Sequence, residues 1–232
     1  MKKIILGLVL LAVLAQYAAP FAIKFYAPYA LQDSLEGDLK IGSLSWNLLA
    51  GKVNATNITF TPHNTQKALG YIGTVHVVFE DLWANPVVID RILFEDVQGA
   101  IVRQDDGSLN AQTTLDALRK NKNAEKPTTA NTNGLKVVVK TFELRRVVVQ
   151  NFVGSNDVNK PLNEIKLQTA LVENIGAGKN PLLLKDLPRE LLAWVLRQQM
   201  QALPALAVGG VVGKAKEALD NVGDALKGLF NN

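Results

Sequence analysis

The sequence predicts an α+β protein that is mainly β. We expect an N-terminal transmembrane helix, then a twisted antiparallel groove-like sheet, then C-terminal amphipathic helices. Three observations predict this: an uncharged apolar run near the N-terminus, separate strand segments with alternating apolar residues between Leu39 and Leu171, and a helical period after Asp186. A period of two is typical of strands and a period of 3.6 is typical of helices.

The N-terminal run carries no charge from Ile4 to Ile23 and follows Lys2 and Lys3. A helix needs ~20 apolar residues to cross the hydrocarbon core of a bilayer. Lysines before the span favour an N-terminus inside the cell. We therefore predict that residues 1–24 form a single-pass anchor in a bacterial inner membrane. The N-terminus would be cytoplasmic and the main domain periplasmic.

A cleaved signal peptide is the alternative for this segment, because it also combines a basic start with an apolar core. Its cleavage site should carry small residues at alternate positions. Residues 15–21 offer no clean pair, and a cut after Ala15 would fall inside the apolar run. The pattern favours the anchor and leaves cleavage open. The chain has no cysteine, so a lipid-modified cysteine, disulfides and thiol chemistry are excluded.

Composition narrows the class of partner. The chain has 232 residues and only 6% aromatic residues, which argues against stacking platforms for nucleic acid. The net charge is +4, and basic residues are concentrated between Arg119 and Arg146. Such a cluster could attract anionic lipid headgroups. A solvated linker and polar strand face are the simpler interpretation.

The first folded segment is predicted at 37–119. In the strand at 39–46 the apolar alternation changes phase at Gly42, which suggests a bulge. Asn110 is predicted to cap a short helix that ends at Arg119, by accepting from an amide two or three residues on. The other predicted strands of this segment are 52–60, 71–79, 87–94 and 97–103.

The rest of the chain is predicted to complete the sheet and then turn helical. Residues 120–134 are polar and low in complexity, which is typical of a linker. Residues 135–175 form a second β segment with strands at 135–140, 144–153 and 162–171. Residues 186–232 hold a helix from Asp186 to Ala202 and an amphipathic helix from Val211 to Phe230. The second helix is expected to pack on its own protein, with membrane contact as the alternative.

No catalytic constellation is present. The sequence contains no nucleophile elbow, no phosphate-binding glycine loop and no dinucleotide fingerprint. His63 and His76 are separated and have no cysteine to complete a metal site. Asp105 and Asp106 precede Gly107 in what is a turn rather than a calcium loop. We therefore expect no enzymatic activity, no metal and no cofactor.

Three features give the chain a family resemblance. The N-terminal run leads into a strand with Ile41-Gly42-Ser43-Leu44, and 82–92 joins a small loop to a strand of the form I-x-x-I. The third feature, at 99–110, is a strand followed by D-G-S-x-N and a helix. Together they resemble the start of the AsmA-like family of envelope proteins (AsmA/TamB type), over about the first half of the chain.

The resemblance implies a repeating β-groove with an apolar concave face, and a role in shielding or moving lipid during envelope homeostasis. Partners would be the membrane, phospholipid or other acyl chains, and other envelope proteins. The chain is short for this family, so a structural accessory or scaffold subunit of a membrane complex is the alternative. An ordinary packed core is the other explanation of the apolar strand faces. The candidate groove residues are Val75, Val77, Phe79, Leu135, Val137, Val139, Ile165, Leu167 and Leu171.

Overall fold

The computed structural model describes residues 37–47, 50–63, 69–104, 106–124, 134–153, 160–178 and 182–201. Within those ranges, no helix has both the length and the apolar character needed to cross a membrane. The predicted anchor at 1–24 and the predicted amphipathic helix at 211–230 lie outside the described residues. Nothing in the structure therefore bears on either of them.

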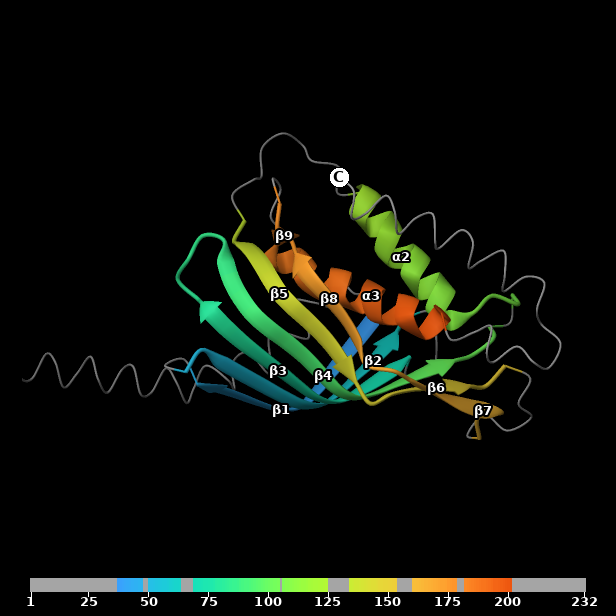
Figure 1. Ribbon diagram of the computed structural model, residues 1–232. Helices are drawn as coiled ribbons and strands as arrows, with labels where there is room; N and C mark the ends of the chain where they lie inside the picture. Colours follow the sequence, from blue (N-terminus) through green and yellow to red (C-terminus); the bar gives the residue numbers. More distant parts are fainter. Residues whose placement is uncertain are drawn as a thin grey trace, which may run out of the picture.

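The described chain forms one nine-stranded sheet with two α-helices, which confirms the α+β, mainly β prediction (Figure 1). Figure 1 shows the sheet curving, with both helices on its concave side. The strands are β1 (Gly37–Asn47), β2 (Lys52–Pro62), β3 (Gly70–Asp81), β4 (Val87–Ile101), β5 (Lys136–Arg145), β6 (Val147–Asn151), β7 (Asn163–Leu167), β8 (Ala170–Ile175) and β9 (Leu182–Leu183). The helices are α2 (Asn110–Ala124), the 3-10 helix η1 (Leu184–Asp186) and α3 (Leu187–Gln201).

The sheet is mixed, so the prediction of an antiparallel sheet is wrong at its centre. Strands β1 to β4 pair antiparallel in sequence order. β4 then pairs parallel with β5 and β6. Helix α2 lies between β4 and β5 in the chain. This crossover returns the chain to the end of the sheet where β4 begins, so β4 and β5 run parallel. β7 and β8 return antiparallel along β6 and β5.

A line of irregular backbone crosses the sheet at one level, which we call the crease. It consists of Gly42, Asn57, Gly73, Asp96 and Arg146, one residue from each of five adjacent strand positions. Asn57, Asp96 and Arg146 have φ of 53°, 56° and 52°, in the left-handed region. Asparagine and aspartate tolerate that region better than most residues do. The crease therefore falls where the sequence permits it.

The crease shifts the inward-facing pattern of each strand by one residue. The two inward-facing residues that flank the crease are three positions apart instead of two, as are Ile72 and Val75 of β3 or Phe94 and Val97 of β4. The predicted bulge at Gly42 is wrong for the same reason. The pairing of β1 with β2 keeps one register through Gly42, because both strands change phase at the same level and no extra residue is inserted.

The crease also explains two other differences from the prediction. Residues 87–101 form one strand instead of the two predicted strands, since Asp96 changes the phase without ending the pairing. The break between β5 and β6 falls at Arg146, on the same line. Local kinks of this kind give a sheet its curvature. We infer that the crease bends the sheet around α3.

An ion pair holds two crease residues together. Nε and Nη2 of Arg146 donate to Oδ1 and Oδ2 of Asp96 at 2.6 Å and 3.0 Å. Nη1 of Arg146 also donates to Oε1 of Glu95 at 3.3 Å. The hydrogen bonds from Arg146 lower the pKa of Asp96. Two parallel hydrogen bonds fix the geometry of such a pair as well as its charge. The pair therefore positions Arg146 in a backbone conformation that arginine seldom adopts.

Asn110 joins the start of α2 to the end of β4, and its side chain is fully buried. Oδ1 of Asn110 accepts the backbone N–H of Val102 at 3.0 Å and of Ala111 at 2.8 Å. Nδ2 of Asn110 donates to the carbonyl of Ala100 at 2.8 Å. The predicted cap two or three residues on is therefore replaced by a tie back to the strand. α2 continues to Ala124, into the segment predicted as linker.

We predict that Gly73→Ala destabilises the fold. A Cβ at Gly73 would lie 2.8 Å from Cβ of Asp96 and 3.3 Å from the carbonyl oxygen of Glu95, so the strands would have to move apart. The expected loss is about 1–3 kcal/mol of unfolding free energy. Urea unfolding of the full chain measures it. Gly178→Ala is the control, because a Cβ there meets nothing within 4 Å. Equal stability of the two variants would contradict a tight crease.

We predict that Asn110→Ala lowers the unfolding free energy by about 1–3 kcal/mol, because it leaves partly buried backbone groups of Ala100 and Val102 without a partner. The melting temperature of the full chain is the measurement. Asn163→Ala, at an exposed asparagine of β7, should leave it unchanged. If Asn110→Ala and Asn163→Ala melt at the same temperature, the hydrogen bonds from Asn110 to β4 do not stabilise the fold.

Candidate functional site: an apolar cavity beside α3

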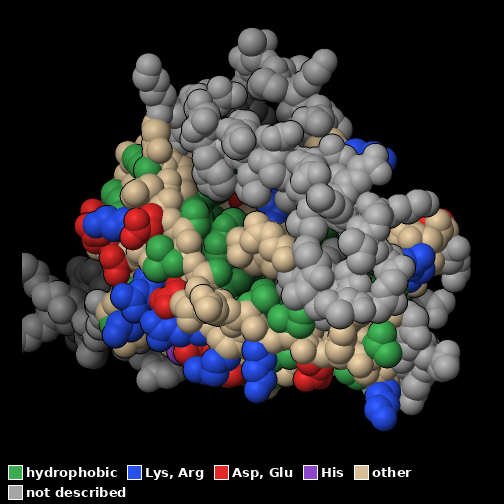
Figure 2. Space-filling model, turned by 45° about the vertical axis from the view of Figure 1, so that its right-hand side comes forward, with side chains coloured by type: hydrophobic (Ala, Val, Ile, Leu, Met, Phe, Trp, Pro, Cys, Tyr) green, Lys and Arg blue, Asp and Glu red, His purple; other side chains and the backbone are tan. Residues whose placement is uncertain are grey.

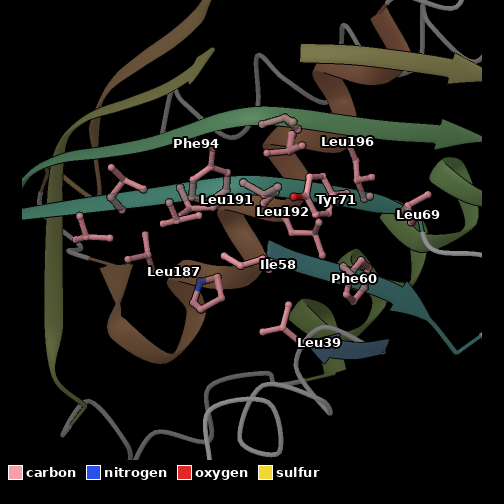
Figure 3. Close-up of a pocket in the computed structure, with 18 of the residues that line it drawn as sticks. Leu39, Ile58, Phe60, Leu69, Tyr71, Phe94, Leu187, Leu191, Leu192 and Leu196 are labelled. Atoms are coloured by element: carbon pink, nitrogen blue, oxygen red, sulfur yellow. The ribbon is translucent and has the colours of Figure 1, made fainter. Parts of the chain in front are cut away.

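A cavity of about 350 Å³ lies between α3 and the concave side of β1 to β4. Figure 3 shows leucines of α3 facing side chains from the strands across this space. The lining runs from Leu39 and Leu69 at one end of the sheet to Leu184 and Pro188 at the other. The other lining residues are Ile58, Phe60, Gly70, Tyr71, Ile72, Val75, Val77, Phe79, Ile89, Ile92, Phe94, Val97, Gln98, Leu187, Leu191, Leu192, Val195, Leu196 and Gln199.

The position of α3 creates the cavity. Trp194 packs edge-on against Phe142 of β5, with ring centroids 5.0 Å apart, and Phe142 packs on Phe94 of β4 at 4.9 Å. At the far end of the helix the carboxamide of Gln199 lies against Gly99 of β4, where a Cβ would come within 2.3 Å of Cδ. These contacts hold α3 over β4 and β5. The apolar faces of β2 and β3 are left beside the helix and form the cavity wall together with Ile89, Ile92, Phe94 and Val97 of β4.

The sequence accounts for α3 and its two apolar sides. The predicted helix from Asp186 to Ala202 matches α3, which follows η1 and begins at Leu187. Nη2 of Arg189 donates to Oδ1 of Asp186 at 3.1 Å in the first turn. The helix is buried on most of its circumference, because one side faces the core and another faces the cavity. The helix is amphipathic, and its buried residues also include Arg189, Arg197 and Gln199.

The structure separates the nine predicted groove residues into three environments. Val75, Val77 and Phe79 of β3 line the cavity together. Val137 and Val139 are fully buried in the core of the sheet. The remaining four lie elsewhere: Ile165 and Leu167 are half-buried against the core, and Leu135 and Leu171 are about half exposed. Only the β3 group therefore faces the cavity.

Sequence reasoning missed the helix side and the β2 side of the cavity. Leu191, Leu192 and Val195 line it from α3, and Ile58 and Phe60 line it from β2. The period of α3 shows that it is amphipathic but not which strands it faces. In β2 the apolar residues stand among asparagines and threonines, and the phase change at Asn57 hides their common face. If the interval of three between Ala55 and Ile58 is taken as one continuous strand face, the sequence does predict that Ile58 faces inward.

The cavity has no chemistry of its own beyond its apolar surface. Among the described residues that line it, none is charged, and the polar ones are Tyr71, Gln98 and Gln199. The hydroxyl of Tyr71 donates to Oδ1 of Asn57 at 2.7 Å. On the face shown in Figure 2, charged side chains gather along the lower and left margins, with hydrophobic ones inside that margin. A site with this lining can hold an apolar group but offers no acid, base or nucleophile.

The two histidines serve local contacts. Nδ1 of His76 lies 2.6 Å from Oδ1 of Asn54, and Nε2 lies 3.5 Å from Oε2 of Glu95. His63 lies 3.7 Å from Asp38 at the edge of the sheet. Among the described ranges, no group of three or more histidine, aspartate or glutamate side chains is arranged to hold a metal ion. Neither histidine belongs to the cavity.

Comparison with known proteins gives no family for this chain. No protein-family model matches it, and no curated protein matches it in sequence. The resemblance to the AsmA-like family stays a prediction.

We predict that two matched substitutions distinguish the core from the cavity wall. Val139→Ala should cost about 2 kcal/mol, since it removes two buried carbons and leaves a void. Val75→Ala should cost less than about 1 kcal/mol, because one side of Val75 faces the cavity and does not contact core atoms. Urea unfolding of both variants is the measurement. A larger loss for Val75→Ala would show that the cavity is closed in solution.

Proposed function

We propose that this chain is a non-enzymatic, membrane-anchored envelope protein of AsmA-like type. It holds one acyl chain of a lipid, or an apolar partner segment, in the cavity beside α3. The observation that carries the proposal is the lining of that cavity, which is apolar on both the strand side and the helix side. An apolar wall of this extent is unusual on a soluble surface unless it receives something.

The size of the cavity supports a single chain. Its volume of about 350 Å³ is at the lower end of the ~300–1,000 Å³ found for ligand sites. Along β3 the lining extends from Gly70 to Phe79, which is about 30 Å at ~3.3 Å per residue. One leaflet of a bilayer has a hydrocarbon depth of about 15 Å, half of ~30 Å. The space therefore fits the tail of one lipid and is too small for a bundle of tails.

The proposed setting follows from the sequence. Residues 1–24 would anchor the chain in a bacterial inner membrane and place the sheet in the periplasm. The predicted amphipathic helix at 211–230 would pack on the same domain beyond α3. In this setting the cavity shields an acyl chain from water, and the role belongs to envelope homeostasis.

A cavity-filling variant tests the proposal. Val75→Phe should occupy the space that the acyl chain needs, and Thr74→Phe adds the same ring at the neighbouring position of β3, which does not line the cavity. The full chain is purified in mild detergent, washed, and its bound lipid is extracted and measured by mass spectrometry. We expect lipid with the unmodified chain and with Thr74→Phe, and at least a fivefold loss with Val75→Phe.

Two outcomes would contradict the proposal. One is equal lipid content in both phenylalanine variants, which would place the lipid outside the cavity. The other is an unmodified chain that carries no lipid but a stoichiometric protein partner. That result would favour the alternative function, a scaffold subunit of a membrane complex.

A further inference from the structure

The most exposed large apolar side chain among the described residues is Trp83, in the loop between β3 and β4. Its relative exposure is 90%. Oδ1 of Asp81 accepts the backbone N–H of Trp83 at 2.9 Å and of Ala84 at 3.0 Å. The loop is therefore an ordered turn that presents the indole to the outside. A fully exposed tryptophan loses the stabilisation that burial of its ring would give.

Two exposed leucines lie at the same end of the sheet as Trp83. Leu135 is 54% exposed and Leu184 is 37% exposed. The N–H of Leu184 donates to the carbonyl of Leu135 at 2.7 Å. β4 and β5 start level with each other, since Val87 pairs with Val137, so Leu135 lies beside the end of the Trp83 loop. We call Trp83, Leu135 and Leu184 the Trp83 patch.

The Trp83 patch is continuous with the cavity. Leu184 belongs to both, since it is partly exposed and also lines the cavity. Phe79, which ends the cavity wall on β3, lies four residues before Trp83. Leu187 and Pro188 extend the same end of the lining on α3. The Trp83 patch and the cavity therefore meet at Leu184.

The charges around the patch are suited to anionic headgroups. Lys136 follows Leu135 and Lys185 follows Leu184 in the chain. Of the nearby acids, Glu80 forms an ion pair with Lys140, Asp81 accepts two backbone hydrogen bonds, and Asp186, which follows Lys185, accepts a hydrogen bond from Arg189. A lysine beside an exposed leucine can keep its ammonium group among headgroups while its stem lies on the apolar surface. Exposed tryptophan with neighbouring lysine is typical of the membrane interface.

We propose that the Trp83 patch docks on the surface of a lipid bilayer with anionic headgroups, where the cavity takes up or releases its acyl chain. This inference rests on the proposed function and adds the source of the lipid and its point of entry. Gly37, the first described residue after the predicted anchor, lies at the opposite end of the sheet, since it pairs with Pro62. The patch therefore meets either a second bilayer or the anchor's own bilayer when the sheet lies along it.

Quenching of tryptophan fluorescence tests the docking. The full chain is reconstituted into vesicles of phosphatidylcholine and phosphatidylglycerol. Brominated lipid, which quenches tryptophan on contact, is placed either in those vesicles or in added acceptor vesicles. We expect quenching in at least one arm, up to the share of one of the three tryptophans. Trp83→Ser should lose that quenching, and the arm that shows it identifies the bilayer.

A displaced tryptophan is the matched control. Leu162→Trp in the Trp83→Ser background puts an indole at a site where the leucine is 61% exposed. The N–H of Leu162 donates to the carbonyl of Asn151, at the opposite end of the sheet from Trp83. The displaced indole should not be quenched in the arm that quenches Trp83. Equal quenching of the two would overturn the docking proposal, because contact with lipid would then be unspecific.

Bound lipid, measured on the same samples, separates this inference from the proposed function. Trp83→Ser leaves the cavity lining intact, so at equilibrium the cavity should still hold lipid, while the variant loses the quenching together with the contact through which lipid enters. An unmodified chain that carries lipid but is quenched in neither arm overturns the docking surface alone. An unmodified chain that is quenched yet carries no lipid supports the docking surface and overturns the proposed function.

Discussion

The crease is the constraint on which the other features of this fold depend. If a strand alternated without interruption, its apolar residues beyond the crease would point away from the core. Each strand instead changes phase beside its neighbour, so that pairing continues and one face stays apolar along the whole sheet. The left-handed residues Asn57, Asp96 and Arg146 make that change, and glycines at 42 and 73 leave room for it. The Arg146–Asp96 pair adds stability that is lost as the pH falls through the lowered pKa of Asp96.

The curved sheet determines where α3 packs. This position decides which apolar strand residues lie in the core and which line the cavity. Phe142 and Trp194 fix the helix over β5, and Gly99 lets Gln199 approach β4. Val137 and Val139 of β5 are completely buried in the core. The helix cannot also cover β3, because neighbouring strands are about 4.8 Å apart and a helix is ~10–12 Å wide. The apolar face of β3 is therefore left open to receive another group.

Much of this architecture could be predicted from the sequence, because local periods indicate the strands, the face of Val75, Val77 and Phe79, and the extent of α3. Three things could not. The parallel pairing of β4 with β5 depends on where α2 returns the chain, which no local pattern specifies. The break at Asp96 looks like a turn until its neighbours are known to break at the same level. The division between core and cavity depends on where α3 packs, and that position is set by the contact of Phe142 with Trp194, more than 50 positions apart in the chain.

The most specific part of the family resemblance now has a physical explanation. In the D-G-S-x-N segment, Oδ1 of Asp106 accepts from the backbone and the hydroxyl of Ser108, and Gly107 takes a φ of 84°. Asn110 then ties the start of α2 to β4. These residues build the turn that begins the crossover, and none of them lines the cavity. In this chain the motif therefore serves the fold and not the cavity. The case for binding an acyl chain rests on the apolar wall between β3 and α3, which the motif supports only by placing the strands.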